Sequence, residues 1–220
     1  MKLDLNMSLM EKNDAIAAAI RAELQQQGVY SINIIGSPGA GKTSLLERLL
    51  PHLPLQTAVI EGDLATARDA RRISACAVPA VQINTDGGCH LDAAMIKKVL
   101  PVFDLAKTDL LIIENVGNLV CPTGFDLGED LRIVLLSLAE GGDKPAKYPA
   151  TFLAADLVLL NKIDLAELCD VDIAQVKAEI AQINPKAEIL EVCCRKNHQQ
   201  GLEELAALLL AKINAKKTQE

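Results

Sequence analysis

Short apolar runs recur along the chain and alternate with segments whose apolar residues lie three or four positions apart. Several runs are apolar at every position, which indicates strands buried on both faces, as in a parallel sheet covered by helices. Strands are predicted at 30–35, 57–60, 81–85, 110–113, 132–138, 157–161 and 188–192. The pattern therefore predicts an α/β fold: a doubly wound, mostly parallel sheet of about seven strands with helices on both faces.

Segments with helical periodicity fill the intervals. Helices are predicted at 44–50, 64–75, 91–100 and 171–183, and Leu202, Leu205, Leu209 and Ile213 mark a closing helix. An N-terminal helix is predicted within 1–28, because Ile16, Ile20 and Leu24 share one face, Ser8 begins a capping box and Gly28 is a C-terminal stop. The expected organisation is this helix, a domain at 29–213 and a polar, frayed tail at 214–220.

Composition narrows the class of protein. The 220 residues fit one large domain, and 22 Lys and Arg against 29 Asp and Glu give a net charge of −7. Because phosphate contacts need basic residues and base stacking needs rings, an acidic chain with 2 Tyr, 3 Phe and no Trp is not expected to bind nucleic acid. The sequence has no apolar run long enough to span a membrane and no signal-peptide pattern, so we expect a cytoplasmic protein without a membrane partner.

The phosphate-binding pattern G-x-x-x-x-G-K-[ST] occurs at 36–43, between an apolar strand and an apolar helix. Glycines let such a loop curl so that its N–H groups point at phosphate oxygens, and the helix N-terminus adds positive charge. Lys42 would contact the β- and γ-phosphates, and Thr43 would bind Mg²⁺. The candidate phosphate-binding residues are Gly36, Ser37, Gly39, Ala40, Gly41, Lys42, Thr43 and Ser44. The alternative is a Gly-rich turn without a ligand.

Carboxylates at the same edge of the sheet are candidates for the Mg²⁺ site. Glu114 directly follows the strand at 110–113, where the second acid of such a site belongs, and Asp63 and Asp69 follow the strand at 57–60. With Lys42, these three acids are the candidate catalytic residues, and with Thr43 they are the candidate Mg²⁺ ligands. The alternative for each is a solvated acid on a loop or helix.

A base-reading motif, N-K-x-D, stands at 161–164 at the end of a predicted strand. The Asp164 carboxylate can accept from both N1–H and the 2-amino group of guanine, whereas adenine has neither donor at those positions. Asn161 can reach the other edge of the base, and the Lys162 stem can cover its face. An unpaired carboxylate would cost several kcal/mol, so the motif favours GTP and GDP over ATP.

The hydrolysis machinery is sparse. No Gln follows Glu114, where a water-positioning residue would stand, although Arg68, Arg71 and Arg72 are candidate cis arginines or else a solvated basic face. The sequence therefore predicts slow intrinsic GTP hydrolysis, about 10⁻⁴ to 10⁻² s⁻¹.

The six cysteines are too sparse for a disulfide scaffold, so they are packed, metal-binding or redox residues. Cys89 and His90 follow one strand, and Cys121 lies on the loop after Glu114. Thiolate and imidazole suit Zn²⁺ or Ni²⁺, and a symmetric dimer can complete a three-ligand site. Ordinary packing is the alternative for this set. The pair Cys193 and Cys194 follows a strand near the expected base loop, and packing is the alternative there too.

Together these motifs resemble one family, the hydrogenase nickel-incorporation GTPases called HypB. The resemblance covers roughly residues 30–210. It is carried by the phosphate-binding loop and by the segments 61–63, 69–70, 89–93, 114–122, 125–128 and 161–164. The segment 114–122 and the Cys89-His90 pair are its most specific pieces.

The resemblance implies a GTP-hydrolysing metallochaperone that assists nickel insertion into [NiFe]-hydrogenase, with maturation proteins as partners. It implies a homodimer linked to nucleotide or metal, with Ni²⁺ or Zn²⁺ held at its interface by Cys89, His90 and Cys121. Residues 1–28 contain no Cys or His, so a nickel-storage segment is not expected there.

The resemblance also bears on the nucleotide site. It makes Asp63, Asp69 and Glu114 residues of the Mg²⁺ site or of nucleotide-responsive loops. The family's guanine loop is here Cys193-Cys194-Arg195, so Cys194 and Arg195 join the candidate base contacts.

Two other functions stay open. A urease-accessory nickel GTPase is similar, but favours a Cys-Pro-His order where this chain has Cys89-His90. A GTPase switch that binds a partner protein without transferring metal would use the cysteines only for packing. A small-molecule kinase on the same scaffold is disfavoured by N-K-x-D.

Overall fold

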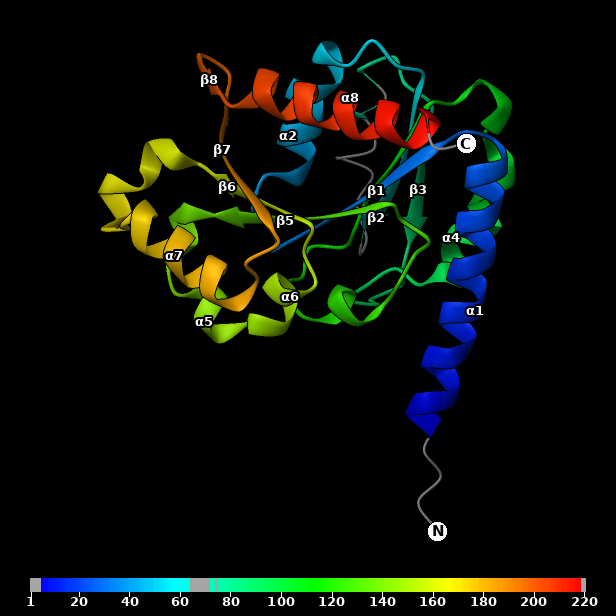
Figure 1. The fold of residues 1–220 in the computed structure, drawn as a ribbon, viewed down its shortest axis with the longest axis horizontal. Helices are drawn as coiled ribbons and strands as arrows, with labels where there is room; N and C mark the ends of the chain where they lie inside the picture. Colours follow the sequence, from blue (N-terminus) through cyan, green and yellow to red (C-terminus); the bar gives the residue numbers. More distant parts are fainter. Residues whose placement is uncertain (1–4, 64–71, 74, 219–220) are drawn as a thin grey trace.

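The computed structural model describes residues 5–63, 72, 73 and 75–218. Its strands form one sheet in the order β3-β2-β4-β1-β5-β6-β7-β8 (Figure 1). The strands are β1 (Tyr30–Gly36), β2 (Thr57–Asp63), β3 (Ala80–Asn84), β4 (Leu110–Glu114), β5 (Leu131–Ser137), β6 (Leu157–Asn161), β7 (Glu188–Arg195) and β8 (His198–Gln200). The first seven pair in parallel, and this confirms the predicted sheet.

Helices cover both faces of the sheet, as a doubly wound fold requires. On one face lie α2 (Lys42–Leu49) and α8 (Leu202–Thr218), and they share an apolar core with β1 and β4. On the other face, α1 (Leu5–Gln26) packs on α4 (Ala93–Val99), while α6 (Pro149–Leu153) and α7 (Ile173–Ile183) cover β5 and β6. The short helix α5 (Lys144–Lys147) lies beside α6 and α7 (Figure 1).

Two local features differ from the sequence analysis, and one prediction is not tested. The eighth strand, β8, was not predicted; it is short, polar and exposed, and it pairs antiparallel with β7. Cys193 and Cys194 do not follow a strand, because β7 continues through Arg195. The helix predicted at 64–75 falls almost entirely outside the described residues.

Both ends of the chain also correct the sequence analysis. Ser8 is not the cap of the N-terminal helix, because α1 already begins at Leu5. Of the three residues predicted to share one face, Ile20 and Leu24 are buried and Ile16 is partly buried. Gly28 has a φ of +69° after the helix end. At the other end, α8 continues to Thr218 into the segment expected to fray. The Lys216 ammonium holds its last turns by contacting both Asp130 carboxylate oxygens, at 2.7 and 2.8 Å.

Candidate nucleotide and metal sites

The phosphate-binding loop joins the end of β1 to the start of α2. Gly41 precedes the helix with a φ of +101°, and a Cβ there would lie 2.7 Å from Asn161 Nδ2, so glycine is required on both counts. The Lys42 ammonium is buried and donates to the Gly36 carbonyl at 3.2 Å, which points it into the loop. The backbone thus forms the curled loop that the motif predicts.

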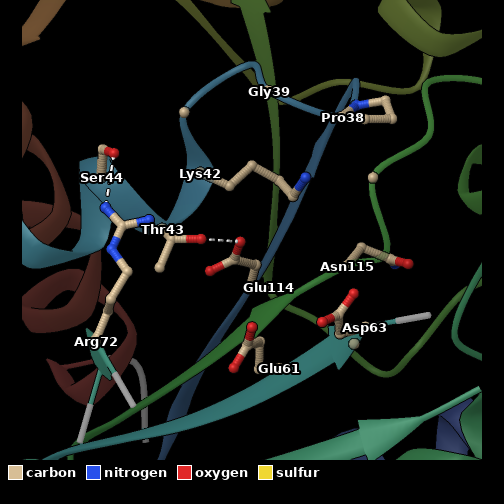
Figure 2. A pocket seen from close by; sticks show the side chains of 13 residues that line it. Pro38, Gly39, Lys42, Thr43, Ser44, Glu61, Asp63, Arg72, Glu114 and Asn115 are labelled. Carbon is tan, nitrogen blue, oxygen red and sulfur yellow. Dashed lines mark hydrogen bonds between the residues drawn. The ribbon is translucent and has the colours of Figure 1, made fainter. Parts of the chain in front are cut away.

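A cavity of about 330 Å³ opens in front of this loop (Figure 2). Its lining joins the loop and α2 to the ends of β2 and β4: Pro38, Gly39, Gly41, Lys42, Thr43, Ser44, Glu61, Gly62, Asp63, Arg72, Glu114, Asn115 and Gly117. The Thr43 hydroxyl donates to Glu114 Oε1 at 2.8 Å. Hydroxyl and carboxylate oxygens are the donors that Mg²⁺ prefers, so this pair fits the predicted cation site.

Neighbouring strands bring further carboxylates to the same cavity. Glu61 and Glu114 are partners in the β2–β4 register, and their side chains are 2% and 4% exposed. Asp63 ends β2 and also lines the cavity. Glu61 lines the cavity but was not among the predicted site residues. The apolar pattern ends at residue 60, whereas β2 continues for three residues and carries Glu61 into the cavity. Asp69 lies outside the described residues.

Among the candidate arginines, Arg72 lines the phosphate cavity, while Arg68 and Arg71 lie outside the described residues. The Arg72 guanidinium donates to Ser44 Oγ at 2.9 Å (Figure 2). It also donates to both carboxylate oxygens of Glu47, at 2.7 and 2.9 Å. These contacts hold the Arg72 guanidinium against α2.

A second cavity of about 500 Å³ adjoins the first. The two share Gly41 and Ser44, and the rest of the second lining is Asn161, Lys162, Asp164, Leu165, Leu168, Cys193, Cys194 and Arg195. Asn161 Nδ2 donates to Ala40 O at 2.8 Å, and Lys162 Nζ donates to Gly39 O at 2.7 Å. The base-reading motif is therefore fastened to the phosphate-binding loop, so one elongated ligand can occupy both cavities.

The contacts to Asp164 come partly from a residue that was not predicted. Cys193 donates its thiol to Asp164 Oδ1 at 3.3 Å, and the Arg195 guanidinium lies 3.6 Å from Asp164 Oδ2. Cys194 lines the cavity and packs against the core, and burial raises the pKa of its thiol to about 12. The alternation of side chains along β7 decides which of the two adjacent cysteines faces the aspartate.

The predicted metal ligands lie near one another. Cys89 Sγ is 3.6 Å from His90 Nδ1, and a hydrogen bond with the Cys89 side chain raises the pKa of the Cys121 thiol. The His90 ring stacks on Phe125 with 3.9 Å between centroids, and burial lowers the pKa of His90. Within the described part of the chain, no group of three or more His, Cys, Asp or Glu is arranged to hold a metal ion in one protomer. The described helices also include none that is long and apolar enough to cross a membrane.

The amino-acid sequence of the chain is similar to those of known proteins. The family model described as CobW/HypB/UreG, nucleotide-binding domain, matches residues 30–191. The hydrogenase maturation factor HypB of Azotobacter vinelandii is 48% identical over 203 residues, 90% of this chain and 66% of that protein. The hydrogenase/urease maturation factor HypB of Helicobacter pylori strain 26695 is 41% identical over 208 residues, 93% of this chain and 85% of that protein. The chain thus spans about two thirds of the length of the Azotobacter relative.

A solved structure agrees with the fold throughout. The crystal structure of HypB from Helicobacter pylori in complex with nickel superimposes with a TM-score of 0.88 at 41% identity, covering 93% of this chain and 96% of that one. The range that the family model matches, 30–191, spans the phosphate-binding loop, the Cys89-His90 pair, Cys121 and the N-K-x-D motif of this chain. The chain belongs to the HypB family of CobW/HypB/UreG nucleotide-binding proteins.

Proposed function

We propose that the chain is a GTPase whose nucleotide spans the two adjoining cavities. The observation that carries this proposal is the fastening of Asn161 and Lys162 to the phosphate-binding loop, which sets Asp164 and Lys42 at the two ends of one cleft. Asp164 would read the guanine edge with Cys194 and Arg195 beside it. The Lys42 ammonium and the loop amides would hold the phosphates.

The residues at the cavity floor support slow hydrolysis. When bound, Mg²⁺ would neutralise charge on the phosphates, and Thr43, Glu114 and Asp63 would be the residues that hold it. Asn115 follows Glu114 and lines the cavity, but its amide is bonded to Asn33 and Leu91, so it does not take the place of a water-positioning Gln. Asp69 stays a candidate from the sequence alone.

We propose nickel as the cargo, bound by Cys89, His90 and Cys121 of two protomers. The proximity of these three residues supports a shared site, and the related Helicobacter pylori protein was crystallised in complex with nickel. Thiolate and imidazole donors also accept Zn²⁺, so zinc is the expected competitor. The relatives are named for hydrogenase maturation, which supports such a role for this chain. We propose that it delivers nickel to a [NiFe]-hydrogenase precursor through maturation proteins, in the cytoplasm.

A second role has one specific observation in its favour. The Helicobacter pylori relative is named for hydrogenase and urease maturation together, so nickel from this chain could also serve a urease. A partner-binding switch without metal transfer is the remaining alternative.

One experiment tests the proposal in two arms. Purified chain is assayed for GTP and ATP turnover with Mg²⁺, and for Ni²⁺ and Zn²⁺ binding with wild type, Cys89→Ala and Cys121→Ala. We expect slow turnover of GTP, none of ATP, and loss of Ni²⁺ affinity in both variants. Equal use of ATP contradicts the GTPase assignment, and unchanged Ni²⁺ affinity in both variants supports the switch instead.

A further inference from the structure

A continuous line of buried polar side chains crosses the sheet on the face opposite α2 and α8. We call it the polar seam and define it by Asn115, Asn33, Glu129 and Arg132. Asn33 stands in the middle of the central strand β1 and is fully buried, and Asn115 and Glu129 are 1% and 8% exposed. Buried polar groups at such positions cost stability unless each is hydrogen-bonded, so the seam calls for a physical reason.

Every link of the seam is made. Asn115 Nδ2 donates to Asn33 Oδ1 at 3.2 Å, and Asn33 Nδ2 donates to Glu129 Oε1 at 3.2 Å. The Arg132 guanidinium donates to the same Glu129 oxygen, with Nη2 at 2.6 Å and Nε at 2.8 Å. A fully satisfied buried network of this kind fixes one arrangement of the segments that it joins.

The two ends of the seam reach both segments that carry the candidate nickel ligands. At one end, Asn115 Oδ1 accepts from the backbone N–H of Leu91 at 3.2 Å, directly after His90. At the other end, Arg132 donates to the carbonyls of Thr123 at 3.0 Å and Phe125 at 3.1 Å, just beyond Cys121.

The seam also touches the nucleotide site. Asn115 lines the phosphate cavity and directly follows Glu114, the acid bonded to Thr43 (Figure 2). Asn33 belongs to the strand that ends at the phosphate-binding loop. A displacement at the phosphate end of β1 or β4 therefore acts on both ligand-bearing segments through Asn115, which lines the phosphate cavity, and through Asn33, Glu129 and Arg132, which do not.

We propose that Asn33, Glu129 and Arg132 are positioning residues that couple the nucleotide state to nickel affinity, with Asn115 as the group through which the seam meets the phosphate cavity. This inference rests on the proposed function. It adds a coupling between nucleotide binding and nickel binding, and it assigns that coupling to named residues. Coupling of two sites requires that the metal bind the two nucleotide states with different affinity, and the seam is the packed, hydrogen-bonded connection between them.

Ser31 provides a matched control. It lies two residues before Asn33 on the same face of β1 and is equally buried, and its hydroxyl bonds to the Gly128 carbonyl and to Asp130. These hydrogen bonds connect Ser31 to residues 128–130, the segment that contains Glu129, but they do not connect it to Asn115. Replacing Ser31 with Ala thus removes buried polar contacts of similar kind without cutting the seam.

The experiment measures the dissociation constant of Ni²⁺ for the full chain with GDP and with a non-hydrolysable GTP analogue. Wild type is compared with Asn33→Ala, Ser31→Ala and Arg132→Lys, and thermal unfolding is followed for each. Arg132→Lys keeps the positive charge beside Glu129 but removes the guanidinium that donates to the carbonyls of Thr123 and Phe125. This variant tests the inference if Asn33→Ala does not fold.

We expect the wild-type constants to differ between nucleotide states by a factor in the usual range for coupled sites, about 5 to 150. In Asn33→Ala and Arg132→Lys the factor should fall towards one, while Ser31→Ala keeps it despite a comparable loss of thermal stability. A wild-type factor that persists in both seam variants overturns this inference alone. Equal constants in wild type overturn the coupling itself, whereas the proposed function is overturned separately, by equal use of ATP or by unchanged Ni²⁺ affinity in the cysteine variants.

Discussion

At the scale of single residues, the charge of Asp164 decides which base is accepted. Asp164→Asn replaces one acceptor oxygen with an NH₂ group that faces a donor of guanine. We expect GDP affinity to fall by about 3 kcal/mol, roughly a hundredfold, because a charge-assisted hydrogen bond is lost. Xanthosine diphosphate carries a carbonyl where guanosine carries the 2-amino group, so its affinity should rise. Calorimetry with both nucleotides measures this, and an equal loss for both would argue against base reading by Asp164.

The Thr43 hydroxyl is the second residue whose loss is informative. Thr43→Val keeps the shape of the side chain and removes the hydroxyl that donates a hydrogen bond to Glu114. In wild type, EDTA should weaken GDP binding about tenfold, in line with one lost charge-assisted contact, whereas the variant should bind equally with and without Mg²⁺. Thr43→Ser restores the hydroxyl and should restore the Mg²⁺ dependence. If Thr43→Val responds to EDTA as wild type does, Thr43 is not a Mg²⁺ ligand.

Residue types were easier to predict than the direction in which they point. The phosphate and base motifs fix Lys42, Asn161 and Asp164 because their chemistry depends on spacing within a few positions. Cys193, by contrast, contacts Asp164 only because β7 continues to Arg195 and alternates its side chains in that register. Two adjacent cysteines carry no signal of that register.

At the scale of elements, the last turns of α8 are held by a contact distant in sequence. Lys216 contacts the Asp130 carboxylate and the Val29 carbonyl, and its side chain is 21% exposed. The neighbouring pair of Lys217 and Asp109 is more exposed, at 43% and 34%. Urea unfolding should show a loss of about 2 kcal/mol for Lys216→Ala and under about 1 kcal/mol for Lys217→Ala. Equal small losses would mean that the end of α8 frays as the sequence suggests.

Elements were predictable where burial determines the residue pattern. The strands at the centre of the sheet are mostly apolar because helices cover them on both sides. Among their polar exceptions, Ser31, Asn33 and Arg132 are hydrogen-bonded. β8 is polar and exposed, so its pairing with β7 leaves no hydrophobic pattern to detect. The end of α8 is polar as well, and the contact that orders it depends on Asp130, which no local pattern connects to Lys216.

At the scale of the whole molecule, we predict that a second copy of the chain completes the candidate metal site. Cys89, His90 and Cys121 come together, yet the described residues of one protomer hold no group of three metal-binding side chains suitably arranged. A two-fold axis beside them would bring two such sets together and supply the missing donors. Ni²⁺ should therefore double the mass of the wild-type chain in light scattering after size exclusion.

Cysteine variants separate this metal-dependent dimer from association by thiol oxidation. Cys121→Ala should stay monomeric with Ni²⁺, whereas Cys169→Ala removes an exposed cysteine elsewhere and should still dimerise. All runs contain a reductant that does not bind metal, so that disulfides do not contribute. A Cys121→Ala chain that dimerises with Ni²⁺ as readily as wild type would place the metal elsewhere. Dimerisation by the GTP analogue alone would instead assign the interface to the nucleotide, with nickel bound after the two copies have met.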